Sequence, residues 1–309
     1  MFPEAQKGPR MHTFEASSRL NLRNIVFLTD FSEPSSAALP FAIALARKYS
    51  ATIHALHVLT PEPYFFPAPG LGTLAAEAHE DSSQEEMERV EAALFGVPHD
   101  TSIVREINVW PALEQTLKEH QADLIVTGTH GRTGAEKLLA GSVAEEVFRR
   151  SRVPVLTIGP QVRRQVHNAA RFHAVMLATD FTPESLAATP YAVSLAQESE
   201  ARLILLHVIR RVAGAEKPPE AELSVAHAMH LLHEMLPPES GRWCRPEAVV
   251  EYGDPVERIL YTARDRDADL IVLGVRDAAG HLSAATHLER TTAHNIVARA
   301  RCPVLTVRG

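Results

Sequence analysis

The chain repeats its own sequence, and this repeat limits the folds open to it more than any other feature. The residues TDFS at positions 29–32 return as TDFT at 179–182, and LHV at 56–58 returns with the same spacing at 206–208. Two later stretches also recur, ADLIV at 122–126 and 268–272 and PVLT at 154–157 and 303–306. Such a regular recurrence indicates a tandem duplication of one structural unit.

The duplication divides the 309 residues into two domains, the number expected for an α/β chain of this length. Residues 22–159 are predicted to form the first domain and residues 173–309 the second. The polar and basic residues 160–172 between them are a predicted linker. Residues 1–21 mix prolines with charged residues and are expected to be a disordered tail.

Each half alternates short apolar runs, typical of buried parallel strands, with segments whose apolar residues recur at helical spacing. The first half predicts strands at 25–29, 52–58, 102–108, 123–128 and 153–158, and helices at 32–49, 84–95, 111–120 and 142–150. The second half predicts strands near 174–179, 202–209, 248–251, 269–274 and 302–307. Ser32 is expected to cap the first helix, and Pro40 to kink it or displace its first turn. With right-handed crossovers, the fold class is α/β, with two doubly wound, Rossmann-like open parallel five-stranded sheets and helices on both faces.

Composition argues against several classes of protein. The net charge of −7 lacks the basic excess that a nucleic-acid-binding surface needs. Apolar runs are too short for a transmembrane helix, and the first residues lack the apolar core of a secretory signal. The two cysteines, Cys244 and Cys302, form neither a disulfide framework nor a four-thiolate zinc site. We therefore expect a cytoplasmic protein with no membrane and no nucleic-acid partner.

A glycine-rich segment follows the predicted fourth strand, where doubly wound sheets bind their ligands. It contains Gly128 and Gly131, and Gly141 and Ser142 lie at the start of the next predicted helix. Neither a Walker A loop nor a dinucleotide fingerprint fits these residues. Glycines before a helix N-terminus are able to hold a phosphate through free amide groups, but they also make tight turns. The local sequence supports both interpretations equally.

The spacing Gly128-x2-Gly131-x9-Gly141-Ser142 resembles the nucleotide-binding pattern of the universal stress protein family. The TDFS turn, the LHV strand and the closing PVL are also similar to that family, once in each half. The resemblance implies a tandem universal stress protein that binds ATP, or ADP or AMP, together with Mg or Mn. Residues of this chain that the resemblance places at the nucleotide are Leu28, Asp30, Val58, Thr127, Gly128, Gly131, Gly141, Ser142 and Val143.

The second half departs from this pattern. Asp277 stands where the first half has Gly131, Arg290 replaces Gly141, and Thr291 replaces Ser142. Asp180 and Val208 are retained, so the second half is compatible with a nucleoside pocket but has no phosphate cradle. We therefore predict a degenerate second site and one tightly held nucleotide per chain, in the first half.

Several other residues favour a structural interpretation. His57 and His207 occupy equivalent strand positions and are expected to be packed and hydrogen-bonded. Cys302 is expected to lie inert in the core. The histidines of one predicted helix are expected to face solvent or another subunit: His227, His230 and His233. His130, inside the glycine segment, is able to face either phosphate or water. The proline-rich residues 61–70 are expected to be a surface loop, with a lid over the pocket or a partner-binding segment as alternatives.

The function that this resemblance implies is a regulatory stress response coupled to ATP binding. The sequence shows no nucleophile–base pair, paired carboxylates or metal-ligand cluster, so we expect no catalytic residues and at most weak ATPase or autophosphorylation activity. The alternatives are a slow nucleotide hydrolase or autophosphorylating enzyme, and a nucleotide-independent scaffold. The family commonly dimerises through its last strand, which implies that 153–158 pairs with 302–307 about a pseudo-twofold axis within the chain. A protein partner of unknown identity is also expected, and the sequence leaves open whether whole chains form a further homodimer.

Overall fold

The computed structural model describes residues 20–60, 71–129, 142–162, 171–210, 224–236, 244–276 and 292–309, with only the backbone for 71–79, 142 and 245. The proline-rich loop 61–70, most of the predicted tail and most of the predicted linker lie outside these residues. Gly131, Gly141, His130, Asp277, Arg290 and Thr291 also lie outside them.

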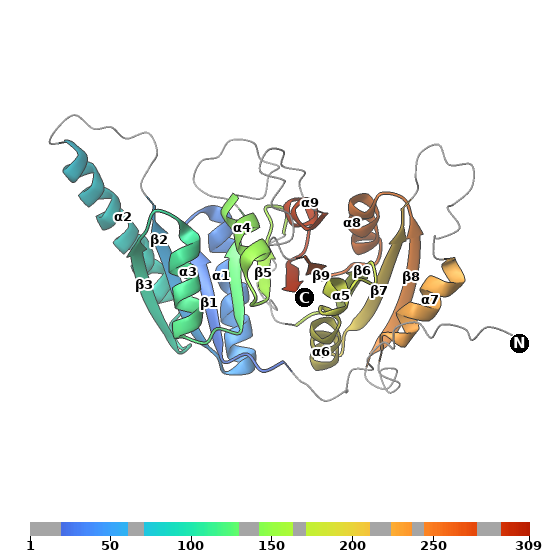
Figure 1. Cartoon of the computed structure of the whole chain (residues 1–309). Helices are drawn as coiled ribbons and strands as arrows, with labels where there is room; N and C mark the ends of the chain where they lie inside the picture. The colour runs from blue at the N-terminus through green and yellow to red at the C-terminus, as the bar shows by residue number, and fades with distance from the viewer. Residues whose placement is uncertain are drawn as a thin grey trace, which may run out of the picture.

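Strands and helices alternate along both halves (Figure 1). The first half contains β1 (Asn24–Thr29), α1 (Glu33–Tyr49), β2 (Thr52–Leu59), α2 (Leu71–Ala93), β3 (His99–Arg105), α3 (Val109–Glu119), β4 (Leu124–Gly128), α4 (Ser142–Arg150) and β5 (Val155–Ile158). The second half contains β6 (Ala174–Thr179), α5 (Pro183–Leu186), α6 (Thr189–Ser199), β7 (Arg202–Ile209), α7 (Val225–Glu234), β8 (Arg245–Tyr252), α8 (Pro255–Asp265), β9 (Leu270–Val275), α9 (Thr292–Arg299) and β10 (Val304–Arg308).

The strands form one ten-stranded sheet in the order β3-β2-β1-β4-β5-β10-β9-β6-β7-β8. Within each half all neighbouring strands are parallel, and the order of the second half mirrors that of the first. The halves meet where β5 and β10 pair antiparallel, with Leu156 opposite Leu305. This confirms the predicted α/β class, with two doubly wound five-stranded halves related by pseudo-twofold symmetry. The two predicted sheets are joined into one through β5 and β10.

Helices cover both faces of the sheet and enclose two apolar cores. On one face α1, α2, α6 and α7 pack over the strands, and on the other face α3, α4, α8 and α9 do so. Buried residues that represent the two cores are Ala42, Met87, Leu195 and Leu232 on the first face and Leu113, Phe148, Ile259 and Ile296 on the second. Each core continues across the β5–β10 junction, because each contains buried residues from both halves.

Proline acts differently in the two halves. Helix α1 begins at Glu33, directly after its Ser32 cap, and runs through Pro40 without interruption. The predicted displacement of its first turn is therefore wrong. In the second half the equivalent segment breaks into α5 and α6, and Pro190 lies in the first turn of α6. A proline there removes no intrahelical hydrogen bond, because the first amides of a helix have no partner within it.

Two predicted boundaries are wrong in the first half. Strand β3 occupies His99–Arg105 rather than 102–108, because Asn108 already has the extended backbone of a helix N-cap and α3 begins at Val109. Helix α2 starts at Leu71, well before the predicted residue 84. Residues 74–80 are mostly alanine and glutamate, which favour helix without giving an apolar stripe.

Candidate functional site

The turn after the first strand has the same hydrogen bonds in both halves. The Asp30 carboxylate accepts a bond from the backbone N–H of Ser32 at 3.0 Å, and Asp180 accepts one from Thr182 at 3.1 Å. These short Asx-type contacts hold each aspartate at the carboxyl end of its strand. Both aspartates therefore lie at the edge where open α/β sheets bind ligands.

A histidine from the neighbouring strand supports each turn. The Nδ1 atoms of His57 and His207 donate to the carbonyl oxygens of Thr29 and Thr179, at 2.8 Å and 2.9 Å. The His57 ring also contacts Phe31, with ring centroids 4.3 Å apart, and the second half repeats this contact. Both histidines are buried, which confirms that they are packed and hydrogen-bonded.

Glycine at the end of β4 permits a close backbone approach. A Cβ atom on Gly128 would lie 2.5 Å from the Pro34 carbonyl carbon and 2.6 Å from the Ser35 nitrogen. Gly274 has the same role in the second half, where a Cβ would lie 2.3 Å from the Cα of Ser185. Because both halves need this glycine for packing, its presence alone does not indicate a phosphate site.

The structure brings part of the predicted nucleotide site together. Leu28 of β1 lies beside Thr127 of β4, and Val58 lies near the end of β2 on the other side of β1. The side chains of Leu28, Val58 and Thr127 are buried, whereas Asp30 is half-buried. At this edge a ligand would therefore meet backbone groups and the Asp30 carboxylate. The strand order changes direction here, between β1 and β4.

The phosphate side of the predicted site is described only at its helix. Helix α4 begins at Ser142, and the Val143 side chain in its first turn is 40% exposed. A helix N-terminus attracts anions through its unpaired amides and its dipole. The loop glycines Gly131 and Gly141 lie outside the described residues.

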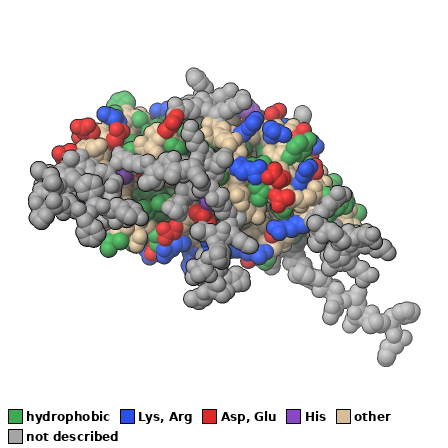
Figure 2. All heavy atoms as spheres, turned by 90° about the horizontal axis from the view of Figure 1, so that it is seen from above, with side chains coloured by type: hydrophobic (Ala, Val, Ile, Leu, Met, Phe, Trp, Pro, Cys, Tyr) green, Lys and Arg blue, Asp and Glu red, His purple; other side chains and the backbone are tan. Residues whose placement is uncertain are grey.

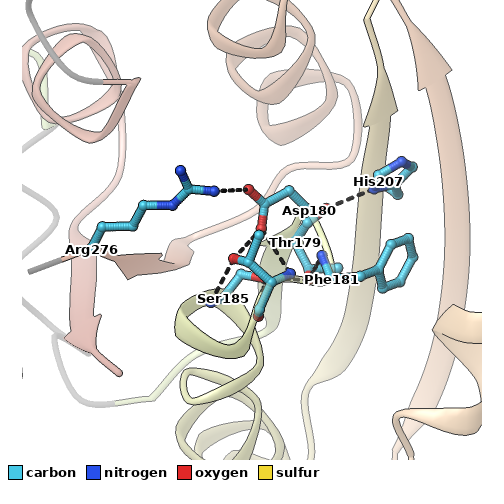
Figure 3. Close-up of polar contacts among 7 residues, drawn as sticks. Thr179, Asp180, Phe181, Ser185, His207 and Arg276 are labelled. Atoms are coloured by element: carbon cyan, nitrogen blue, oxygen red, sulfur yellow. Dashed lines mark hydrogen bonds and ion pairs between the residues drawn. The ribbon is translucent and has the colours of Figure 1, made fainter. Parts of the chain in front are cut away.

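In the second half an arginine occupies the space beside the aspartate. The Arg276 guanidinium, just after β9, lies 3.8 Å from the Asp180 carboxylate (Figure 3). Burial raises the pKa of Asp180, but hydrogen bonds from Thr182 and Ser185 and the charge of Arg276 outweigh it, so this pKa lies below its ordinary value. The comparison of the two halves did not identify Arg276 as a site residue. Its position directly after β9, the strand that ends beside Asp180, is the sequence feature that would have indicated this contact.

A histidine–aspartate cluster lies at the opposite end of the strands. His54, near the start of β2, bonds Asp100 of β3 at 2.7 Å and Asn24 of β1 at 3.2 Å. The His120 ring stacks on His54 with centroids 3.7 Å apart. His54, Asp100 and His120 have the residue types of a metal site. However, both His54 nitrogens already have partners, and face-to-face rings do not aim their lone pairs at one point, so the cluster is better explained as packing.

Cys302 and the three histidines of α7 lie where their structural interpretations predict, in the core and on the surface. Cys302 is buried, and burial raises the pKa of its thiol. His227, His230 and His233 are exposed on α7, and His230 pairs with Glu234 at 3.1 Å. None of the helices in the described ranges is long and apolar enough to cross a membrane. Seen from above, the described surface mixes acidic and basic side chains (Figure 2).

The buried histidines predict a loss of stability in acid. Burial lowers the pKa of His207 and of His54, despite the opposing effects of Thr179, Asp180 and Asp100. The unfolded chain then binds protons more readily than the folded chain as pH falls below about 6.5. The free energy of unfolding should therefore decrease from pH 7 to pH 5, by up to about 1.4 kcal/mol per pH unit for each histidine.

Urea denaturation of a His207→Gln variant between pH 5 and pH 8 tests this expectation. The variant should show a shallower dependence on pH than the natural chain. His227→Gln, at an exposed histidine, should leave the dependence unchanged. Equal slopes for the natural chain and His207→Gln would contradict the assignment.

The chain consists of two doubly wound α/β units. Each unit has an aspartate turn after its first strand and a close-packed glycine at the end of its fourth. Open α/β folds of this class have their ligand sites at the carboxyl ends of the strands. The Universal stress protein family matches residues 21–159 and again residues 171–308. The chain therefore belongs to the universal stress protein family, with two family domains in tandem and a stress-response role.

Known relatives agree with this assignment. Universal stress protein MJ0531 of Methanocaldococcus jannaschii is 35% identical over 139 residues, which cover 44% of this chain and 81% of the relative. A universal stress protein structure from Archaeoglobus fulgidus has a TM-score of 0.65 at 20% identity, covering 92% of this chain and 98% of that one. A universal stress protein structure from Pseudomonas aeruginosa has a TM-score of 0.58 at 16% identity, covering 93% of each chain. The two structures extend the likeness of fold across both halves.

Proposed function

We propose that this protein is a cytoplasmic, ATP-binding universal stress protein with a regulatory role. In this proposal, the nucleotide lies in the first half, between the carboxyl ends of β1 and β4. The observation that supports it most directly is the position of the Asp30 carboxylate at the point where the strand order reverses. Such a switch point is the preferred ligand site of open α/β sheets.

The residues of this edge fit a nucleotide. Asp30 is suited to accept hydrogen bonds from ribose hydroxyls, and backbone groups near Leu28 and Val58 would border the base. The amides at the start of α4, with Gly131 and Gly141, would hold the phosphates. A bound Mg or Mn ion would neutralise phosphate charge, and we propose that it enters with the nucleotide rather than through a set of protein ligands.

The second half supports a single site per chain. There the exposed Asp180 carboxylate is paired with Arg276, so a ribose would have to displace a charged partner. The loop substitutions Asp277 and Arg290 add to this obstacle. An exposed ion pair is worth only about 0–1 kcal/mol, so these loop substitutions carry most of the expected difference.

Two measurements on the natural chain test the proposal. Mass spectrometry of freshly purified protein should detect bound adenine nucleotide, and calorimetric titration with Mg-ATP should saturate near one site per chain. Absence of both signals would favour a scaffold that uses no nucleotide. A stoichiometry near two would show that the second half also binds. Steady release of ADP would indicate an enzyme instead of a regulatory binding protein.

Asp30→Ala should weaken Mg-ATP binding by about 1–3 kcal/mol, the usual effect of losing a hydrogen bond to a charged group. Calorimetry measures the change in affinity. Asp180→Ala makes the same change in the second half and should leave the affinity of the first site unaltered. If the two variants lose affinity equally, or neither does, the ribose contact lies elsewhere.

A further inference from the structure

The pseudo-twofold axis of the chain brings equivalent residues of the two halves face to face. Leu156 of β5 pairs with Leu305 of β10, and these residues are 149 positions apart, the spacing of the repeat in this region. Near such an axis, each residue meets its own equivalent from the other half. In a duplicated chain the two equivalents are free to differ.

One equivalent pair carries complementary groups above the junction, where α4 and α9 lie (Figure 1). Glu145 and His294 are also 149 positions apart, and the Glu145 Oε2 atom lies 2.9 Å from the His294 Nδ1 atom. Their side chains are only 11% and 5% exposed. Arg149, one turn along α4, lies 3.5 Å from the same glutamate. Because the contact is largely desolvated, a mismatch there is costly.

A second equivalent pair lies on the other face of the sheet, where α1 and α6 end. Lys48 and Glu198 are 150 positions apart, and the Lys48 Nζ atom lies 3.9 Å from the Glu198 carboxylate. Glu198 also accepts hydrogen bonds from the hydroxyl of Tyr49 and from the backbone N–H of Leu20, the latter at 3.1 Å. Leu20 thus belongs to the junction and not to the predicted disordered tail.

We propose that these two pairs make the junction selective for unlike halves, so that the partner surface of the first half is the second half and not a copy of itself. A junction between two first halves would oppose Glu145 to Glu145 and Lys48 to Lys48. A junction between two second halves would oppose His294 to His294 and Glu198 to Glu198. If two identical halves paired, the same side chain would face itself on both faces of the sheet. When the first half pairs with the second, the facing side chains are complementary on both faces.

Single substitutions reproduce each like contact within the full chain. His294→Glu gives the glutamate pair of two first halves, and Glu145→His gives the histidine pair of two second halves. Hydrogen exchange of the β5 and β10 amides reports opening of the junction. We expect each single variant to lower their protection about tenfold or more. The exchanged double variant Glu145→His/His294→Glu should return protection to within about threefold of the natural chain, because it restores an unlike pair.

Three further variants complete the test. Glu146→His makes the same change at the next, more exposed position of α4 and should leave protection unchanged. Lys48→Glu should lower protection more than Lys48→Met, which removes the charge but keeps an apolar stem. Failure of the exchanged double variant to recover, including failure to fold, would overturn the proposal. So would equal effects of Lys48→Glu and Lys48→Met.

Discussion

Gly141→Arg should abolish measurable Mg-ATP binding and raise the Kd about 100-fold or more. The substitution copies the residue that the second half carries at this position, Arg290. In the proposed site it would remove two or three charge-assisted contacts between backbone amides and phosphate, each worth about 1.5–3 kcal/mol. Each 1.4 kcal/mol is a tenfold change in affinity. Calorimetric titration measures the loss.

The fold should survive this change, because the second half tolerates arginine there. Circular dichroism and the thermal midpoint should match those of the natural chain. Arg290→Gly is the reciprocal control, and it should leave the stoichiometry near one because Asp277 remains. Unchanged affinity in a natively folded Gly141→Arg variant would place the nucleotide elsewhere.

Gly128→Ala should lower the free energy of unfolding by about 3 kcal/mol, at the upper end of the usual range for overpacking. The added methyl group would lie 2.5 Å from the backbone of Pro34, which cannot rotate away as a side chain would. Urea denaturation measures the effect. Gly274→Ala should be at least as destabilising in the second half, since its Cβ would lie 2.2 Å from the Glu184 carbonyl oxygen.

This pair of variants also separates packing from binding. A Gly274→Ala chain that keeps its first half folded should still bind one Mg-ATP. If Gly128→Ala is as stable as the natural chain but loses nucleotide affinity, then Gly128 acts through the ligand and not through α1. Mild effects of both substitutions on stability would contradict the packing argument.

Local sequence patterns predicted the elements of this fold because each pattern has one dominant cause. The apolar run that ends in the Thr29 turn is a fully buried strand, and α4 occupies the predicted residues 142–150. The recurrence of the same turn at Thr179 predicted the second half. The boundaries of β3 and α2 were predicted wrongly because the features that set them do not recur with a regular spacing. The end of β3 depends on the N-cap of α3 at Asn108, and the start of α2 depends on residues of high helix propensity.

The candidate site was predictable at its strand ends and less so around them. Asp30 and Asp180 stand out because they directly follow apolar strands. Arg276 was open to prediction only from its place directly after β9, and its contact with Asp180 depends on the sheet order that places β9 beside β6. The Glu145–His294 pair joins two helices distant in sequence, so no local pattern predicts it. The nucleotide, its metal ion, the protein partner and the cytoplasmic location stay predictions.

Because β5 and β10 pair within one polypeptide, the contact between the halves depends neither on protein concentration nor on two identical sequences. Association between separate subunits weakens as their concentration falls, but a tethered pair keeps a fixed effective concentration. The assembled state of the two halves is therefore independent of how much protein the cell contains. Because each residue at the junction is encoded once, a substitution changes one side alone. Such a chain is free to keep a ligand site in one half and to change the equivalent residues of the other half.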